Sequence, residues 1–179
     1  MDGRLIKGSI MILLLMLVFV SAACVSAESN DTTVLTLSKS GITINYPSNW
    51  GYSDALSSYS IMAISKADSV DSFGVGQVNI NIEKKPFEGD FATFVNSTYE
   101  PMKYNNDYDL VSSGSTTIAG NDALEYIYTS NENGVQKQHK AVWFEKGGQA
   151  YVLLYSAPLD KFESNLYVFD YIVSDIRIT

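Results

Sequence analysis

Few side chains in this sequence could carry out acid–base, nucleophilic or metal chemistry. His139 is the only histidine and Cys24 is the only cysteine among the 179 residues. A lone histidine cannot complete a zinc site, and no serine or cysteine flanks His139 in sequence to indicate a catalytic triad. We therefore predict no catalytic residue, no cofactor and no enzyme, and we expect His139 to be structural or solvent-exposed near a sheet edge.

Two further segments contain residue types that occur in ligand sites. The segment Asn105–Asp109 offers amide and carboxylate oxygens that could coordinate Ca²⁺. Its spacing lacks the glycine and the final glutamate of a calcium loop, so a solvated loop is the better interpretation and we predict no metal site. Gly74-Val75-Gly76 lacks the third glycine and the strand-to-helix setting of a nucleotide loop.

Some polar and aromatic side chains are candidates for modification or for partner binding. Asn30 and Asn96 begin the patterns Asn-Asp-Thr and Asn-Ser-Thr, which are glycosylation acceptors, although short patterns of this kind also arise by chance. Aromatic side chains in loops are frequent in protein interfaces. The tyrosines that fall in expected loops, and form the candidate partner-binding surface, are Tyr52, Tyr59, Tyr104 and Tyr108.

The amino terminus has the anatomy of a secretory signal peptide. Arg4 and Lys7 precede an unbroken apolar run over residues 10–20, and small residues follow. This run is shorter than the ~20 apolar residues of a membrane span, but an uncleaved anchor helix is the alternative. We expect residues 1–27 to be the leader, 28–33 a polar tether and 34–179 one domain.

Two processing routes remain open for this leader. Val25-Ser26-Ala27 has the small-residue pattern of ordinary signal cleavage. Ser21-Ala22-Ala23-Cys24 resembles a lipobox, in which Cys24 is lipidated, but a serine stands where leucine is commonest. Either route predicts an extracytoplasmic protein, secreted or lipid-anchored at the outer face of the cytoplasmic membrane, with membrane contact only through the leader or the lipid.

Composition excludes several other classes of protein. Because Cys24 lies in the leader, the remaining domain has no disulfide and depends on its core, which a chain of this length can supply. The full chain has 20 acidic and 12 basic residues. Loss of Asp2, Arg4 and Lys7 with the leader leaves 19 and 10, a net charge of −9. Nucleic-acid binding needs a basic face, so we predict none.

The fold prediction depends on residues 123–157. Asn133-Gly134 and Gly147-Gly148 are pairs suited to two-residue turns, which predicts a three-stranded antiparallel meander. In that register Tyr126 faces Ala141 and Trp143 faces Val152. One face then carries Leu124, Tyr126, Tyr128, Ala141, Trp143, Val152 and Leu154, and the other carries Ile127, Val142, Phe144, Tyr151 and Leu153. Since both faces are apolar, we expect both to be covered, most simply by helices.

Helical periodicity predicts two helices that could cover the faces of the sheet. Residues 90–103 carry apolar side chains at helical spacing after Asp90, a suitable N-cap, and residues 160–174 do so after Asp160 and Glu163, an acidic variant of a capping box. Shorter strands are expected at 34–37, 42–46, 61–65, 77–83 and 110–118, with Trp50 and Tyr52 as loop anchors. The predicted fold is α+β, an α/β/α sandwich with a central, mainly antiparallel sheet and a helix on each face.

Several segments resemble PsbP-like domains. The resemblance rests on Gly41–Trp50, with Tyr-Pro before a tryptophan, on the turn Ile118–Leu124, and on the closing segments Tyr151–Pro158 and Ser174–Ile178. It extends from about Gly41 to Ile178 and implies the same sandwich. The family's namesake is an extrinsic subunit of photosystem II that helps retain calcium and chloride, and a Ran-binding nuclear-import factor shares the fold.

The resemblance implies a non-enzymatic role in binding or assembly, with an unknown protein partner at the cell surface. The matching positions are core and turn residues, so no ligand set is transferred. The alternative is a carrier that holds a small ligand between a helix and the sheet. A closely placed pair of carboxylates in a deep cleft would instead favour an enzyme.

Overall fold

The computed structural model describes residues 33–53, 58–132 and 134–179, so the expected leader, Cys24, Asn30 and all of the expected tether except Thr33 lie outside the described residues. The elements in chain order are β1 Val34–Lys39, β2 Ile42–Pro47, β3 Trp50–Ser53, β4 Ser60–Lys66, the 3₁₀ turn η1 Ala67–Ser69, β5 Asn79–Pro86, α1 Phe91–Tyr99, the 3₁₀ turn η2 Pro101–Tyr104, β6 Tyr108–Ile118, β7 Asn121–Glu132, β8 Val135–Lys146, β9 Gln149–Pro158, α2 Leu159–Asp175 and β10 Arg177–Ile178.

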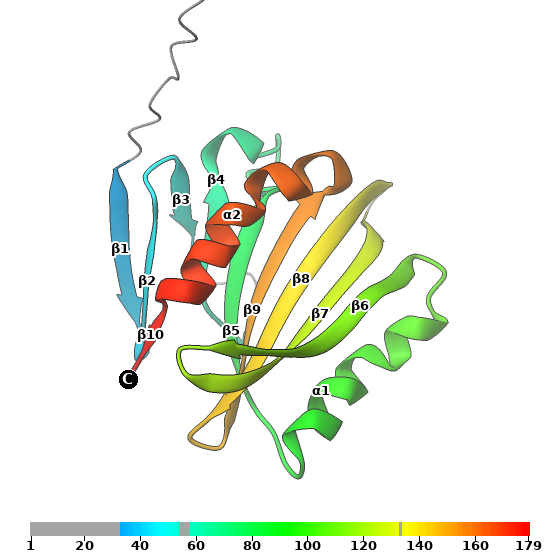
Figure 1. Cartoon of the computed structure of the whole chain (residues 1–179). Coiled ribbons are helices and arrows are strands. Elements are labelled where there is room, and N and C mark those ends of the chain that lie inside the picture. Colours follow the sequence, from blue (N-terminus) through cyan, green and yellow to red (C-terminus); the bar gives the residue numbers. More distant parts are fainter. Residues whose placement is uncertain (1–32, 54–57, 133) are drawn as a thin grey trace, which may run out of the picture. The chain divides into compact units, whose positions relative to one another are not determined.

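The described part of the chain forms a mixed α+β fold with one large antiparallel sheet, a small sheet and two α-helices (Figure 1). The large sheet has seven strands in the order β3-β4-β5-β9-β8-β7-β6. The small sheet has three strands in the order β1-β2-β10, so the two ends of the described domain pair with the same strand. Strands, rather than helices, make up most of the structure.

The predicted meander is confirmed as β7, β8 and β9. Tyr126 pairs with Ala141 and Trp143 pairs with Val152, as expected from turns at the two glycine-containing pairs. Gly147 and Gly148 have φ angles of 61° and 70°, the left-handed values that a type I′ turn requires at both central positions.

Two hydrophobic clusters lie on opposite sides of this meander. In one cluster Tyr99 of α1 packs against Trp143 of β8. In the other, Phe169 of α2 packs against Tyr155 of β9, and Ile44 of β2 joins the same cluster. The α2 side is therefore shared between a helix and the small sheet, which the sequence analysis did not foresee.

The helix boundaries follow local side-chain chemistry in one case only. Asp90 caps α1 as predicted, because its carboxylate accepts a hydrogen bond from the Thr93 N–H at 2.8 Å, which also lowers the pKa of Asp90. The helix ends before Pro101, earlier than expected. The predicted capping box of α2 is wrong: the helix begins at Leu159, and its N-cap Pro158 has no side chain that can accept a hydrogen bond.

Two other expectations are corrected by the strand order. Trp50 and Tyr52 lie in β3 rather than in a loop, and Trp50 alone of the pair is buried. His139 does not lie at a sheet edge, because β8 has a strand on either side, and only 3% of the residue is exposed. The pairing of β5 with β9, which extends the sheet beyond the meander, joins segments about 70 residues apart and leaves no local signal.

We expect the glycine turn after β8 to contribute measurably to stability. Gly148→Ala places a Cβ at a positive φ and should lower the free energy of unfolding by about 1–2 kcal/mol. Gly114→Ala is the matched control, because a Cβ at Gly114 meets no atom within 4 Å and its φ is not positive. Urea denaturation of both variants measures the difference, and equal stability would contradict the turn assignment.

Candidate functional site

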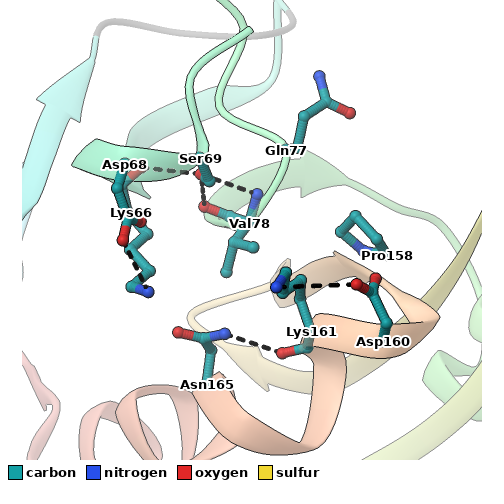
Figure 2. Close-up of a pocket in the computed structure, with 9 residues that line it drawn as sticks. All are labelled: Lys66, Asp68, Ser69, Gln77, Val78, Pro158, Asp160, Lys161 and Asn165. Carbon is teal, nitrogen blue, oxygen red and sulfur yellow. Dashed lines mark hydrogen bonds and ion pairs between the residues drawn. The ribbon is translucent and has the colours of Figure 1, made fainter.

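A hollow of about 390 Å³, which we call the loop-end cleft, lies where the segment after β4 meets the start of α2 (Figure 2). Its lining mixes charged, polar and apolar side chains. The residues are Lys66, Asp68, Ser69, Gln77, Val78, Pro158, Asp160, Lys161 and Asn165.

The loop side of this cleft is organised by hydrogen bonds to two side chains. Asp71 accepts hydrogen bonds from the backbone N–H groups of Val75 (3.0 Å) and Phe73 (2.9 Å), and the Val75 N–H contributes most to lowering the pKa of Asp71. The Gln77 amide donates to the same carboxylate at 2.8 Å. Ser69 accepts from the Val78 N–H at 3.1 Å, so the loop returns to the sheet in a defined conformation.

The helix side of the cleft exposes the beginning of α2. Because Pro158 provides no side-chain cap, the first backbone N–H groups of the helix have no such acceptor. Asn165 is 4% exposed, and its amide donates to the Lys161 carbonyl at 2.8 Å. Lys66 pairs with Asp68 at 3.1 Å and Lys161 lies 3.7 Å from Asp160, so the positive charges of this cleft are balanced locally.

A second hollow of about 690 Å³ adjoins the first and shares Gln77 and Pro158 with it. Its lining is unusually rich in exposed apolar side chains. Phe73 is 90% exposed, Val75 48% and Val135 42%. The other residues that line it are Asp71, Gln77, Glu132, Lys137 and Pro158. Exposed apolar side chains beside charged groups are typical of a surface that contacts another protein.

A buried polar cluster on the sheet lies beside this second hollow. His139 bonds through Nε2 to the Ser130 hydroxyl and through Nδ1 to the Ser156 hydroxyl, each at 2.8 Å. Its ring stacks on Tyr128 with centroids 4.6 Å apart. Glu132, which lines the hollow, lies 3.7 Å from Nε2 and pairs with Lys137 at 2.7 Å.

This cluster differs from a catalytic triad in its geometry. A triad places the carboxylate on the imidazole nitrogen opposite the nucleophile. Here Glu132 and Ser156 do approach opposite nitrogens, but the Glu132 oxygen is 3.7 Å from Nε2, which is too far for a hydrogen bond. Nε2 is bonded instead to Ser130 at 2.8 Å, and Ser156 is only 7% exposed. Burial lowers the pKa of His139 to about 4, despite the opposing effect of Glu132, so the ring is neutral at pH 7 and acts as a hydrogen-bonded core residue.

A third, smaller hollow of about 200 Å³ lies between α1 and the sheet. Aromatic side chains of Tyr99, Tyr128 and Trp143 line it, and an ion pair of Glu83 and Lys85 at 2.8 Å stands beside them. Burial raises the pKa of both tyrosines above the usual value, so they remain neutral phenols. The remaining lining residues are Thr98, Met102, Ala141, Val152 and Leu154.

The tyrosines selected from the sequence do not form one surface. Tyr104 is 87% exposed after α1, whereas Tyr52 lies near Lys39 and Tyr59 lies near Lys85. The prediction that Tyr108 lies in an exposed loop is wrong. Tyr108 begins β6 and is only 6% exposed, because its ring packs against Tyr128.

The other site predictions remain predictions. Asn96 is exposed on α1, and its side-chain oxygen accepts a hydrogen bond from Tyr126. In the Asn105–Asp109 segment, the Asn105 side chain accepts the Asp107 N–H, as in an ordinary polar turn. Across the described residues, no three His, Cys, Asp or Glu side chains gather closely enough to hold a metal ion.

Neither large hollow was predicted from the sequence. Each is built from segments that are distant along the chain, around residues 66–78, 132–137 and 158–165. One local signal was available: the meander register also places His139 opposite Ser156. Nothing in the sequence indicated that the loop after β4 would fold back beside the buried polar cluster around His139.

The chain belongs to the PsbP-like protein family, whose family model matches residues 21–178. This result confirms the resemblance found in the sequence. The comparison with curated proteins finds no match.

Solved structures with a similar fold come from several organisms. Cyanobacterial PsbP (CyanoP) from Synechocystis sp. PCC 6803 is 12% identical with a TM-score of 0.60, over 85% of this chain and 96% of that one. LpqN, involved in cell envelope biogenesis of Mycobacterium tuberculosis, is 16% identical with a TM-score of 0.57, over 84% and 92%. The Saccharomyces cerevisiae Ran-binding protein Mog1p is 7% identical with a TM-score of 0.55, over 82% and 96%. At these identities the likeness shows the fold alone.

Neither α1 nor α2, nor any other helix in the described ranges, has the length and apolar composition needed to cross a bilayer.

The buried histidine predicts a specific dependence of stability on pH. In the unfolded chain His139 takes up a proton near pH 6.5, whereas in the folded protein it does so only near pH 4. The unfolded state therefore binds more protons in this window, and the free energy of unfolding should fall by up to about 3 kcal/mol between pH 6.5 and 4. His139→Gln should remove this part of the slope in urea denaturation; an unchanged slope would contradict it.

Proposed function

We propose that this chain is an exported, cell-surface PsbP-like domain that acts as a non-enzymatic binding or assembly module for a protein partner. The family membership supports a module of this fold. Of the solved structures with a similar fold, one is described as a Ran-binding protein and one as involved in cell envelope biogenesis. The partner of this chain is taken to be different and unknown.

The observation that carries this proposal is the second hollow. Phe73 is almost fully exposed on a loop that Asp71 holds in place. Because the loop is already ordered, binding a partner would cost less conformational entropy. Val75 and Val135 extend the apolar surface, and the ion pair of Glu132 with the buried Lys137 adds charged groups to the lining. Aromatic anchors surrounded by polar groups are the usual centre of a protein interface.

A layered arrangement of helices and sheet would leave this end of the sheet open to a partner. We infer that α1 covers one face of the meander and α2, with the small sheet, covers the other, as in an α/β/α sandwich. The contacts of Tyr99 with Trp143 and of Phe169 with Tyr155 support this arrangement. Covered faces leave the ends and edges of the sheet as the accessible surfaces.

Export remains part of the proposal. The leader anatomy supports an extracytoplasmic location, secreted or anchored through a lipid on Cys24. Labelling cells with a radioactive fatty acid separates the two routes: label on the wild type that is lost in Cys24→Ser indicates a lipid anchor, and an unlabelled wild type excludes one.

The third hollow favours a second candidate function, a carrier for a small ligand held between α1 and the sheet. Its volume of about 200 Å³ is below the roughly 300–1,000 Å³ of typical ligand pockets, so it would suit only a small molecule. We predict that a carrier retains its ligand when the protein is extracted gently, so native mass spectrometry would show an adduct. A spectrum of the unliganded chain alone would count against this function.

We predict that Phe73→Ser reduces capture of the partner by about tenfold or more, because it removes the most exposed apolar side chain of the second hollow. The measurement is affinity capture of the full chain after chemical cross-linking in the cells that produce it. Tyr167→Ser is the matched control, since Tyr167 is 61% exposed but lies on α2 and does not line this hollow.

Two outcomes would speak against this function. A wild-type chain that repeatedly captures no protein would leave the binding module without support. Equal loss of capture in the Phe73 and Tyr167 variants would show that the second hollow is not the contact surface.

A further inference from the structure

The outer edge of the large sheet is open along β6. This strand is last in the sheet order and pairs only with β7 (Figure 1). Across the described ranges, no backbone hydrogen bond joins residues 109–118 to any segment other than β7. A bulge between Leu110 and Ser112 interrupts the pairing, and a regular stretch of strand follows it.

This edge lacks the side chains that normally prevent strand pairing. Natural proteins protect long edge strands with lysine, proline or inward-pointing charges. Residues 110–118 contain neither a charged residue nor a proline, and most of them are exposed. By contrast, the opposite edge strand β3 spans only Trp50–Ser53.

The hairpin geometry identifies which backbone groups point outward. Ala119 and Gly120 form a two-residue turn with φ angles of 48° and 75°, so the closing pair of Ile118 and Asn121 exchanges hydrogen bonds. Because hydrogen-bonded and non-hydrogen-bonded pairs alternate, the backbone groups of Ser113, Ser115 and Thr117 point away from β7.

A side-chain pocket borders the same edge. A hollow of about 340 Å³ lies beside Ser115, against the first turn of α1. Phe91, Ala92 and Leu124 supply its apolar walls, and Asp122 lies at its margin. Ser115 and Leu124 are cross-strand partners, so an apolar side chain of a strand added next to β6 could reach this hollow.

The charge around this edge favours a basic occupant. From Tyr104 to Gln136 the chain carries five carboxylates and no lysine or arginine. Lys140 pairs with Glu125 and Lys137 pairs with Glu132. For Asp109 and Asp122 no ion pair occurs within the part of the chain that the structure describes. A second copy of this chain would bring two acidic hairpins together, which is unfavourable.

We propose that the β6 edge and its adjacent hollow bind an extended peptide segment of a partner, which adds a strand to the sheet and carries an apolar side chain flanked by lysine or arginine. Backbone hydrogen bonds to residues 113–117 would provide affinity, and the hollow with Asp122 would provide selectivity. This surface is separate from the second hollow, so it goes beyond the proposed function rather than restating it.

The test uses fluorescein-labelled synthetic peptides and the full chain in detergent. The probe peptide alternates lysine and valine over seven residues, and its matched control alternates glutamate and valine. Fluorescence anisotropy should show binding of the lysine peptide at least about tenfold tighter than the glutamate peptide, and Asp122→Asn should reduce that preference.

Variants at one edge position separate backbone pairing from general charge attraction. Ser115→Pro removes an outward N–H and should weaken binding of the lysine peptide by about tenfold, whereas Ser115→Ala keeps the N–H and should bind as the wild type does. Thermal denaturation checks that the proline variant folds. If it does not, a lysine peptide with N-methylated alternate residues replaces it and should fail to bind the wild type.

Three results would overturn the proposal. The first is equal binding of the lysine peptide by the wild type and the Ser115→Pro variant, and the second is full binding of the N-methylated peptide. The third is a wild-type dimer in sedimentation that the Ser115→Pro variant abolishes, because a second copy of the chain would then occupy the edge. The binding module at the second hollow and the peptide site at the β6 edge can be disproved independently. If the Ser115→Pro variant still captures the cellular partner, that partner does not need the β6 edge. If Phe73→Ser has no effect on capture, the peptide experiments still test the β6 edge.

Discussion

Two buried hydrogen bonds, one on each side of the β8–β9 ribbon, connect the helices to the sheet. On one side the Trp143 indole N–H donates to the Tyr99 hydroxyl of α1 at 2.7 Å. On the other, the Tyr155 hydroxyl donates to the Phe162 carbonyl of α2 at 2.8 Å. A buried polar group left without its partner costs about 1–3 kcal/mol, so moving either helix away from the ribbon would cost free energy of that order. The apolar clusters around both bonds reinforce the same constraint.

This constraint determines where the protein can interact with other molecules. Tyr99 of α1 contacts Trp143 on one side of the ribbon, and Phe162 of α2 contacts Tyr155 on the other. Contacts with other molecules are therefore expected elsewhere, such as at the end of the sheet near the loop after β4, in the small hollow beside α1 and at the open β6 edge. The buried polar cluster around His139 lies beside the second hollow. The His139 ring stacks on Tyr128, and its hydrogen bonds to Ser130 and Ser156 satisfy the polar groups there.

Features set by short-range chemistry were predictable from the sequence. Glycine pairs defined the meander and its register, and Asp90 marked the start of α1. Features set by long-range pairing were not. The partner of β9 is β5, which no local pattern indicated. The prediction that His139 lies near a sheet edge was wrong even though the meander already places β8 between β7 and β9. Asp160 resembled a cap, yet the chain already turns into the helix at Pro158.

Residue-resolved amide hydrogen exchange of the full chain tests the central claim most directly, since it reports which backbone groups are enclosed and which are open. The amides of β8 and β9 between the two helices, such as Val142 and Leu153, should exchange most slowly. Along β6, Ser113, Ser115 and Thr117 should exchange quickly while Gly114 and Thr116 are protected by β7. Uniform protection along β6, or exchange in β8 as fast as at that edge, would contradict the account of a closed ribbon with an open edge.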